Sequence, residues 1–250
     1  DLFGRDPSET YFTSIMPCVW KRPESDESVF EHDGVRDVDN VITTKDLGQL
    51  LRYHNIDPLN LSPEEYDSPF QNDNSPESGA GTGAGQLFGT TGGVMEAAVR
   101  SVYEIVTGSQ LPRLELKEVR GLDGVKEASI SLYNNKTGRG MKTNLNVAVA
   151  NGLGNAKKLI KKMRDGGAHY DFVEVMACPG GCIGGGGMPK GEKGILEKRS
   201  AVIYDLDKNL PIRRSHENPI IKKFYESHIG EMNGAKAHEL LHVKPVYGEE

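Results

Sequence analysis

The sequence predicts an α/β fold, in which mixed and partly parallel twisted sheets are flanked by helices. Three observations carry this prediction. Strand-like and helix-like stretches alternate between residues 91 and 177, which is the order that βαβ units give. The chain has 250 residues, 36% hydrophobic and 26% charged, enough for one large domain or two small ones with a real core. Its apolar runs stay well short of the roughly 18–20 residues that a membrane helix needs.

The first third of the chain contains one well-marked helix. We expect, in order, a strand over 11–16, a charged surface loop over 20–34, a strand over 35–44, a helix over 44–54 and an irregular stretch over 56–87. In the helix, Leu47, Leu50 and Leu51 recur at helical spacing, and Thr44 is the expected N-cap. The irregular stretch is rich in Pro, Asn, Ser and Gly, and loops of this length are usually functional or mobile.

The remainder of the chain alternates helices and strands. We expect, in order, a helix from 91 that stops at Gly108, β-rich stretches over 113–119 and 127–133, a turn over 134–138, a strand over 146–150, a helix over 154–164, a strand over 172–177 and short helices near 220–228 and 235–242. The buried face of the first helix is expected to comprise Val94, Ala97, Ala98, Val102 and Ile105, and that of the second Ala156, Leu159, Ile160 and Met163.

Charge and cysteine content exclude some functions. Thirty Lys and Arg against 36 Asp and Glu give a net charge of −6, which argues against a nucleic-acid partner or an anionic membrane surface. The three cysteines, Cys18, Cys178 and Cys182, make a poor disulfide framework. They fit metal or thiol chemistry in a reducing compartment better.

The sharpest local feature is the segment MACPGGCIGGGG, from Met176 to Gly187. It contains two cysteines four residues apart and six glycines, and it follows an expected buried strand. Glycines let a backbone wrap closely and aim N–H groups at cluster sulfurs or anionic ligands, so the segment predicts a clamp for a metal ion or an iron–sulfur cluster. The alternative is a pair of unreactive buried thiols beside a flexible loop. A phosphate-binding P-loop is disfavoured because no Gly-Lys-Ser/Thr follows.

Other features stay open between a functional and a structural interpretation. Seven glycines within 79–93 precede the first long helix, whose N-terminus would attract an anion unless the segment is a mobile loop. Cys18 and the nearby Lys21 are by themselves a core cysteine and a solvated lysine. The basic side chains of the 154–164 helix favour a solvated face over a docking patch for an acidic electron carrier; they are Lys157, Lys158, Lys161, Lys162 and Arg164. The seven histidines lack zinc-like spacing and are interpreted as structural.

Several stretches in the right order resemble the catalytic domain of [FeFe]-hydrogenases. They are TSIMPCVWK (13–21), VRDVDNVITTKDLG (35–48), FGTTGGVMEAAVR (88–100), VANGLGNAKKLI (149–160), EVMACPGGCIGGGG (174–187) and the tail SHENP (215–219) with HELLH (238–242). The resemblance covers nearly the whole chain. It implies the family's two-lobed fold with the cofactor between the lobes. It also implies a large-subunit-like region over 1–204 and a small-subunit-like tail over 205–250.

The resemblance implies a cofactor and its ligands. Cys18, Cys178 and Cys182 match three of the four thiolates that hold the [4Fe–4S] part of the H-cluster. The sulfur of Cys182 also matches the bridge to the [2Fe] subcluster, which carries CO, CN⁻ and a bridging dithiolate. Lys21 matches the lysine that donates a charge-assisted hydrogen bond to a cyanide ligand. Cys182 and Lys21 are therefore the catalytic candidates.

Three apolar side chains complete the implied site. Met16, Phe88 and Met176 match the lining that keeps the diiron subcluster dry and fixed. The chemistry agrees with this implication, because ligands such as CO and CN⁻ call for soft, apolar walls and one or two aimed donors.

One family motif is missing from the sequence. TSCCP, which in the family supplies the fourth cubane thiolate and the cysteine that relays protons, does not occur here. A cubane needs four thiolates and this chain has three, so a fourth ligand must come from elsewhere. The chain also opens with Asp1, without a leader. We therefore expect a fragment or processed form, completed by an N-terminal half of the domain on the same gene or on a partner chain.

The function implied is reversible H₂ formation and oxidation, 2H⁺ + 2e⁻ ⇌ H₂, by a ferredoxin hydrogenase. The expected partners are ferredoxin or a similar electron carrier and the maturation proteins. The alternatives are a hydrogenase-like, Narf-like iron–sulfur assembly protein and a truncated, catalytically silent homologue. Thiol usage indicates a reducing compartment, and the family suggests anaerobic cytoplasm or an organelle of hydrogenosome or plastid type.

Overall fold

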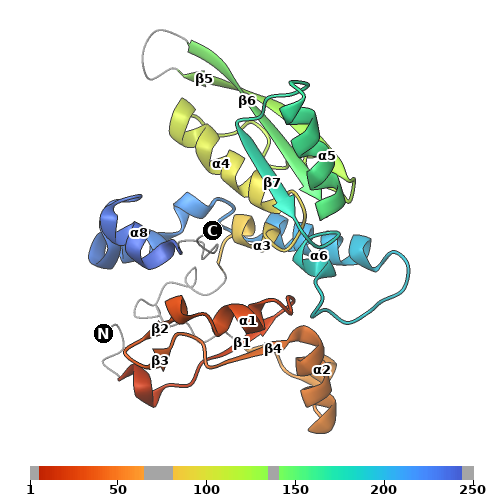
Figure 1. Cartoon of the computed structure of the whole chain (residues 1–250), viewed down its shortest axis with the longest axis vertical. Coiled ribbons are helices and arrows are strands. Elements are labelled where there is room, and N and C mark those ends of the chain that lie inside the picture. Colours follow the sequence, from red (N-terminus) through yellow and green to blue (C-terminus); the bar gives the residue numbers. More distant parts are fainter. Residues whose placement is uncertain (1–5, 65–80, 135–140, 244–250) are drawn as a thin grey trace.

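The computed structural model describes residues 6–64, 81–134 and 141–243. Residues 135–138 of the expected turn over 134–138 and residues 65–80 of the expected irregular stretch over 56–87 lie outside the described residues. Figure 1 shows two groups of elements, one built on β5, β6 and β7 and the other on β1 to β4 with α1 and α2. The predicted α/β fold is confirmed.

The larger sheet has the strand order β5 (Val125–Asn134), β6 (Met141–Asn151) and β7 (Phe172–Met176). β5 and β6 are antiparallel, whereas β6 and β7 are parallel and connected by α5 (Leu153–Arg164). This β6–α5–β7 unit confirms the predicted βαβ connection. The expected strand over 113–119 is wrong: this stretch forms bends and turns, and Leu116 and Val119 are buried in the core without a strand partner.

The core lies on both faces of the larger sheet. Val147 and Val149 of β6 pack against Met95 and Val99 of α4 (Gly93–Thr107). Successive strand residues point to opposite faces, and the intervening Ala148 and Ala150 pack against Ala156 and Leu159 of α5. The predicted strand over 146–150 is therefore buried on both sides.

The predicted helix faces are partly wrong. Val102 and Ile105 of α4 are 37% and 60% exposed, whereas the charged residues Glu96 and Arg100 of the same helix are buried. The charges are tolerated there because Glu96 and Arg100 form an ion pair at 2.7 Å. In α5 the expected Ile160 and Met163 are also 55% and 36% exposed.

The smaller group contains two pairs of short strands. β1 (Thr13–Met16) and β4 (Asn40–Thr43) are parallel, and β2 (Glu31–His32) and β3 (Val35–Arg36) form an antiparallel hairpin. The single strand expected over 35–44 is therefore two strands with different partners.

The expected loop over 20–34 contains the short helix α1 (Lys21–Ser25) and strand β2. Pro23 is compatible with α1, because N–H groups in a first helical turn have no intrahelical partner. Helix α2 (Thr44–Tyr53) confirms the prediction except for its cap. The cap is Thr43, whose hydroxyl accepts from Asp46 N at 3.1 Å while the Asp46 carboxylate accepts from Thr43 N at 2.8 Å.

Two further helices lie near the middle of Figure 1, beside the group built on β5, β6 and β7. α3 (Gly83–Leu87) lies in the stretch expected to be irregular, and it packs against α6 (Ile195–Asn209), which the sequence analysis did not predict. The expected short helices near 220–228 and 235–242 are present as α7 (Pro219–Phe224), continued by a π-helical turn over Tyr225–Ile229, and α8 (Ala235–Leu241). Single 3₁₀ turns occur at Pro7–Glu9, Ser28–Phe30, Pro58–Asn60, Cys182–Gly184 and Ser215–Glu217. None of the helices in the described part of the chain has the length and apolar character that crossing a membrane requires.

Candidate metal centre

The two cysteines of the glycine-rich segment lie on a loop that follows β7. We call residues 178–184 the cysteine loop. Its backbone lies directly against the turn before α4, because Thr91 N donates to Gly180 O and Ile183 N donates to Gly89 O, both at 3.0 Å. Gly181 has φ +90°, and a Cβ there would lie 2.8 Å from Thr90 C and Thr91 N. A side chain at this position would therefore push the loop away from the turn.

The third cysteine comes from the other end of the chain and reaches the same place. Gly187 N donates to the carbonyl of Pro17, the residue before Cys18, at 2.8 Å. A Cβ at Gly185 would collide with the same carbonyl, and one at Gly186 would lie 3.2 Å from Val19. The glycines after Cys182 thus allow the backbone around Cys18 to approach the cysteine loop.

The three cysteine thiols lie close enough for their charges to interact. Partial burial raises the pKa of the Cys182 thiol, and the nearby Cys18 and Cys178 raise it further, whereas Lys21 lowers it. Cys18 and Cys178 are half-buried and Cys182 is exposed. Three thiols whose negative charges would repel one another are a donor set that a soft metal ion or an iron–sulfur cluster stabilises. The residues therefore fit such a group, with three thiols from this chain.

Lys21 and Met16 lie beside Cys18 on the smaller group. Met16 ends β1, and Lys21 begins α1 three residues after Cys18. The Lys21 ammonium forms an ion pair with Glu24, one helical turn further on, and its side chain is 46% exposed. Met16 and Lys21 also line a cavity of about 140 Å³, together with Phe30 and other side chains.

Met176 and Phe88 flank the cysteine loop on the larger group. Met176 is half-buried at the end of β7, where its carbonyl accepts from Gly152 N at 2.7 Å. Phe88 follows α3 and is 49% exposed. It directly precedes Gly89, whose carbonyl binds the cysteine loop. The predicted site residues thus all lie on the segments around the three thiols.

Sequence reasoning missed three polar side chains behind the cysteine loop. Glu174 accepts from Gly92 N at 2.6 Å and from Met95 N at 2.7 Å, so it occupies the N-terminus of α4. The anion expected at this helix N-terminus is therefore a carboxylate of the protein itself. Lys126 donates to Gly121 O at 2.7 Å, and the Asn151 side chain accepts from Gly180 N at 2.8 Å. The signal that would have revealed Glu174 is a glutamate inside the apolar strand Phe-Val-Glu-Val-Met.

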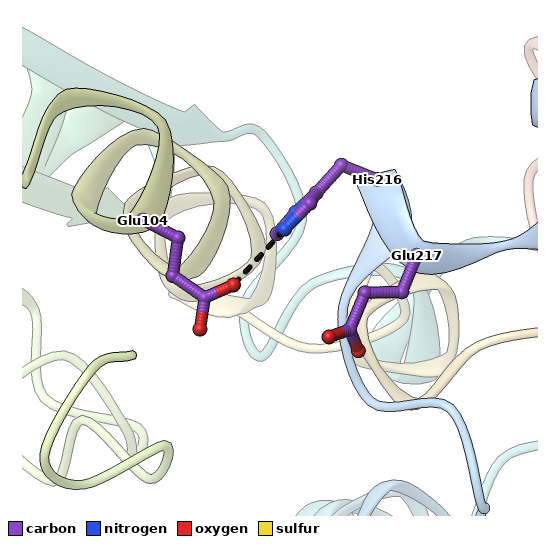
Figure 2. Close-up of side chains that lie close together, drawn as sticks. All are labelled: Glu104, His216 and Glu217. Atoms are coloured by element: carbon purple, nitrogen blue, oxygen red, sulfur yellow. Dashed lines mark hydrogen bonds and ion pairs between the residues drawn. The ribbon is translucent and has the colours of Figure 1, made fainter. Parts of the chain in front are cut away.

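A second cluster of potential metal ligands lies away from the thiols. Figure 2 shows Glu104 of α4 beside His216 and Glu217. The histidine Nε2 lies 3.0 Å from a Glu104 oxygen, and its Nδ1 lies 3.0 Å from the Ser101 hydroxyl. Arg214 pairs with Glu104 at 2.7 Å and with Glu217 at 3.2 Å. The guanidinium thus neutralises both carboxylates, and the cluster is a set of ion pairs that joins the C-terminal region to α4.

Comparison with known families identifies the fold. The family model described as "Iron only hydrogenase large subunit, C-terminal domain" matches residues 1–186. The chain belongs to this family. A second model, described as "Iron hydrogenase small subunit", matches residues 193–244. The resemblance to iron hydrogenases is therefore confirmed.

Curated relatives include the NADP-reducing hydrogenase subunit HndD of Solidesulfovibrio fructosivorans, at 43% identity, and iron hydrogenase 1 of Clostridium pasteurianum, at 40%. Each match covers 97% of this chain but only 39% and 41% of the relative, respectively. The chain thus spans about two-fifths of the length of these hydrogenases. Cytosolic Fe-S cluster assembly factors of Drosophila willistoni and Xenopus tropicalis are also similar, at 32% and 27% identity.

Solved iron hydrogenases have the same fold. The structure of apo [FeFe]-hydrogenase HydA1 from Chlamydomonas reinhardtii matches with a TM-score of 0.78 and 46% identity, over 95% of this chain and 63% of that chain. The predicted division of the chain at residue 204 stays a prediction, as do the individual roles of the site residues.

Proposed function

We propose that this chain is the cofactor-binding region of an [FeFe]-hydrogenase that catalyses 2H⁺ + 2e⁻ ⇌ H₂ and exchanges electrons with ferredoxin or a similar carrier. The observation that carries the proposal is the meeting of Cys18 with Cys178 and Cys182 through backbone contacts that only glycines allow. Membership of the iron hydrogenase family and higher identity to hydrogenases than to assembly factors support it.

The thiolates of the chain would hold the inorganic group. Cys18, Cys178 and Cys182 would bind a [4Fe–4S] cluster, and the Cys182 sulfur would also bind the [2Fe] subcluster with its CO, CN⁻ and dithiolate ligands. The exposure of Cys182 fits this second bond, since an exposed thiol is accessible to a further group. When bound, the H-cluster supplies the chemistry of proton reduction and H₂ cleavage.

The other site residues would bind, orient and exclude water. Lys21 would donate a hydrogen bond to a cyanide ligand from the ammonium that here pairs with Glu24. Met16, Phe88 and Met176 would cover the diiron subcluster with apolar surface. Phe88 and Met176 are partly exposed here, which leaves apolar surface available to a bound group.

The fourth cubane ligand would come from another segment. The sequence contains three cysteines and lacks TSCCP, so we propose that an N-terminal half of the domain, on the same gene or as a partner chain, completes the site. Maturation proteins would deliver the diiron subcluster. The need for a diiron subcluster would distinguish an enzyme from the two alternatives, a Narf-like assembly protein and a catalytically silent homologue.

Infrared spectroscopy after anaerobic maturation tests the proposal. The chain is matured alone and together with a supplied N-terminal segment that contains TSCCP. We expect sharp CO and CN⁻ bands with the segment, H₂ evolution from a reduced ferredoxin, and loss of both in Cys182→Ala. Iron–sulfur absorption without CO and CN⁻ bands in either sample would favour the assembly-type or silent homologue. A Cys182→Ala sample with normal H₂ evolution would disprove the role of Cys182.

A further inference from the structure

A row of three side chains crosses the larger sheet behind the cysteine loop. Lys126 of β5 pairs with Val149 of β6, and Val149 pairs with Glu174 of β7. Residues paired in register point to the same face of a sheet, and Val149 faces α4. Lys126 and Glu174 therefore lie on the α4 side, and each is only 6% exposed. Buried charges at such positions require partners.

Glu174 finds its partners at the beginning of α4. Its two carboxylate oxygens accept from Gly92 N and Met95 N at 2.6 and 2.7 Å. These hydrogen bonds, together with the helix dipole, stabilise the charged carboxylate against the burial that raises its pKa. The carboxylate therefore holds the first turn of α4 to the strand that leads to Cys178.

Lys126 binds the same turn from the other side. Its ammonium donates to Gly121 O at 2.7 Å and to Thr91 O at 3.3 Å. Burial lowers the pKa of Lys126 to about 8, and the charges of Glu174 and Asp123 oppose this shift. Thr91 is also the residue whose N–H binds Gly180 O of the cysteine loop. One short turn is thus held by two buried charged side chains, Lys126 and Glu174, and in turn holds the cysteine loop.

The turn has little freedom to move elsewhere. A Cβ at Gly92 would collide with Val119 O, and one at Gly93 would collide with Leu87 O. The turn is therefore packed between the 116–119 segment and α3, and it contacts the cysteine loop through backbone hydrogen bonds. Any shift of residues 89–93 would carry Gly180 and Ile183 with it.

We propose that Glu174 and Lys126 are positioning residues, which fix residues 89–93 as the template that sets the spacing of Cys178 and Cys182. The significance of this inference rests on the proposed cluster site, but its test needs no cluster. Failure of the template and failure of the hydrogenase function are therefore separate results.

The test measures the reactivity of individual thiols in the folded chain. Glu174→Gln removes the charge at the α4 N-terminus, and Lys126→Met removes both hydrogen bonds of the ammonium while keeping the approximate length of the side chain. Glu127→Gln and Lys162→Met are the controls, because these residues form an exposed ion pair at 2.7 Å at the edge of the same sheet. Each protein is treated with iodoacetamide under native conditions, and modification of each cysteine is followed by mass spectrometry.

In Glu174→Gln and Lys126→Met we expect half-buried Cys178 to react about tenfold faster than in the wild type, since each substitution removes at least one charge-assisted hydrogen bond that holds residues 89–93. Lys126→Arg should restore most of the protection. Cys18 provides an internal reference and should change less than about twofold, as should all sites in the two controls. An unchanged rate at Cys178, or an equal increase at Cys18 and Cys178, would overturn the proposal.

Hydrogen exchange in the wild type provides a second test that needs no stable variant. Under native conditions with low urea, we expect the amides of residues 89–95 and 178–184 to open together with one free energy. Independent opening of the two segments would contradict a template, whatever the fate of the variants.

Discussion

Arg100 and Asp207, 107 positions apart in the sequence, form a bidentate ion pair at 2.7 and 2.8 Å, with both side chains fully buried. Glu96, Arg120 and Arg213 complete the network around them. Asp207 and Arg213 belong to the region that matches the small-subunit family, whereas the other three belong to the large-subunit region. The two regions are therefore joined by buried charges rather than by apolar packing alone.

Asp207→Ala should destabilise the chain by about 3–5 kcal/mol, because three arginines lose a buried counter-charge. Urea unfolding followed by circular dichroism measures this loss. Glu118→Ala, which breaks the exposed ion pair with Arg113, is the matched control and should cost less than about 1 kcal/mol. Equal effects of the two substitutions would show that the buried network contributes no special stability.

Acid should weaken the same network at a defined pH. Although burial raises the pKa of Asp207, hydrogen bonds from Arg100 and Arg213 lower it from 3.8 to about 2. A lowered pKa means that the stabilisation is complete above pH 3.8 and disappears as the pH falls through 2. The advantage of the wild type over Asp207→Asn should therefore shrink by about 2 kcal/mol across this range, as measured by urea unfolding at each pH. If the difference in unfolding free energy between the two proteins does not change with pH, Asp207 is not the group that titrates in this range.

Alkaline pH should have the opposite effect through Lys126. Its pKa is lowered from 10.5 to about 8, so the unfolded chain binds more protons between these values and stability rises with pH. Between pH 8 and 10.5 the wild type should gain about 3 kcal/mol relative to Lys126→Met. Other titrating groups, including Cys182, are common to both proteins and cancel in the difference. Lys162→Met should leave the pH dependence of the wild type intact.

The contact between the cysteine loop and the α4 turn can be tested with two glycines of similar backbone conformation. Gly181 and Gly152 have φ of +90° and +87°, but a Cβ at Gly152 has nothing within 4 Å. Both alanine variants carry backbone strain, and only Gly181→Ala adds a collision with Thr90 and Thr91. We expect Gly181→Ala to be about 2 kcal/mol less stable than Gly152→Ala and to retain less iron after reconstitution. Equal stability and equal iron retention would argue against this contact.

Lys21→Ala should reduce the diiron content of the matured protein several-fold by removing the proposed donor to cyanide. Infrared band intensity per [4Fe–4S] cluster measures this content. Lys45→Ala, an exposed lysine on α2 of the same group, provides the control and should leave the intensity unchanged. Unchanged band intensity in Lys21→Ala would remove this residue from the site.

The thiol site could be predicted from sequence because its signals are residue types and spacings. Two cysteines among six glycines mark one half of the site. Cys18 was assigned as a cluster ligand only through the family resemblance. Sequence could not show how the halves meet, since that depends on Gly185 and Gly187 passing the Pro17 carbonyl at close range. The structure therefore adds the contact between these two segments, and it adds no new type of residue to the thiol site.

The helices were predicted less well wherever charges are buried. In α4 the hydrophobic pattern chose Val102 and Ile105, but Glu96 and Arg100 face inward because they pair with each other and with the rest of the network. Helix α6 escaped prediction for a similar reason, since its fully buried Asp207 interrupts any apolar stripe. Periodicity of apolar residues identifies a core face only when the core is apolar.

The meeting of Cys18 with Cys178 and Cys182 has a thermodynamic consequence. A cluster bound by all three would be a cross-link that closes a loop of about 160 residues. In a chain-entropy description, such a closure lowers the entropy of the unfolded chain by an amount worth about 5 kcal/mol, as a disulfide would. Loss of iron would then remove this cross-link between the two ends of the loop. Chelation or oxidation of the cluster would therefore destabilise parts of the chain far from the iron.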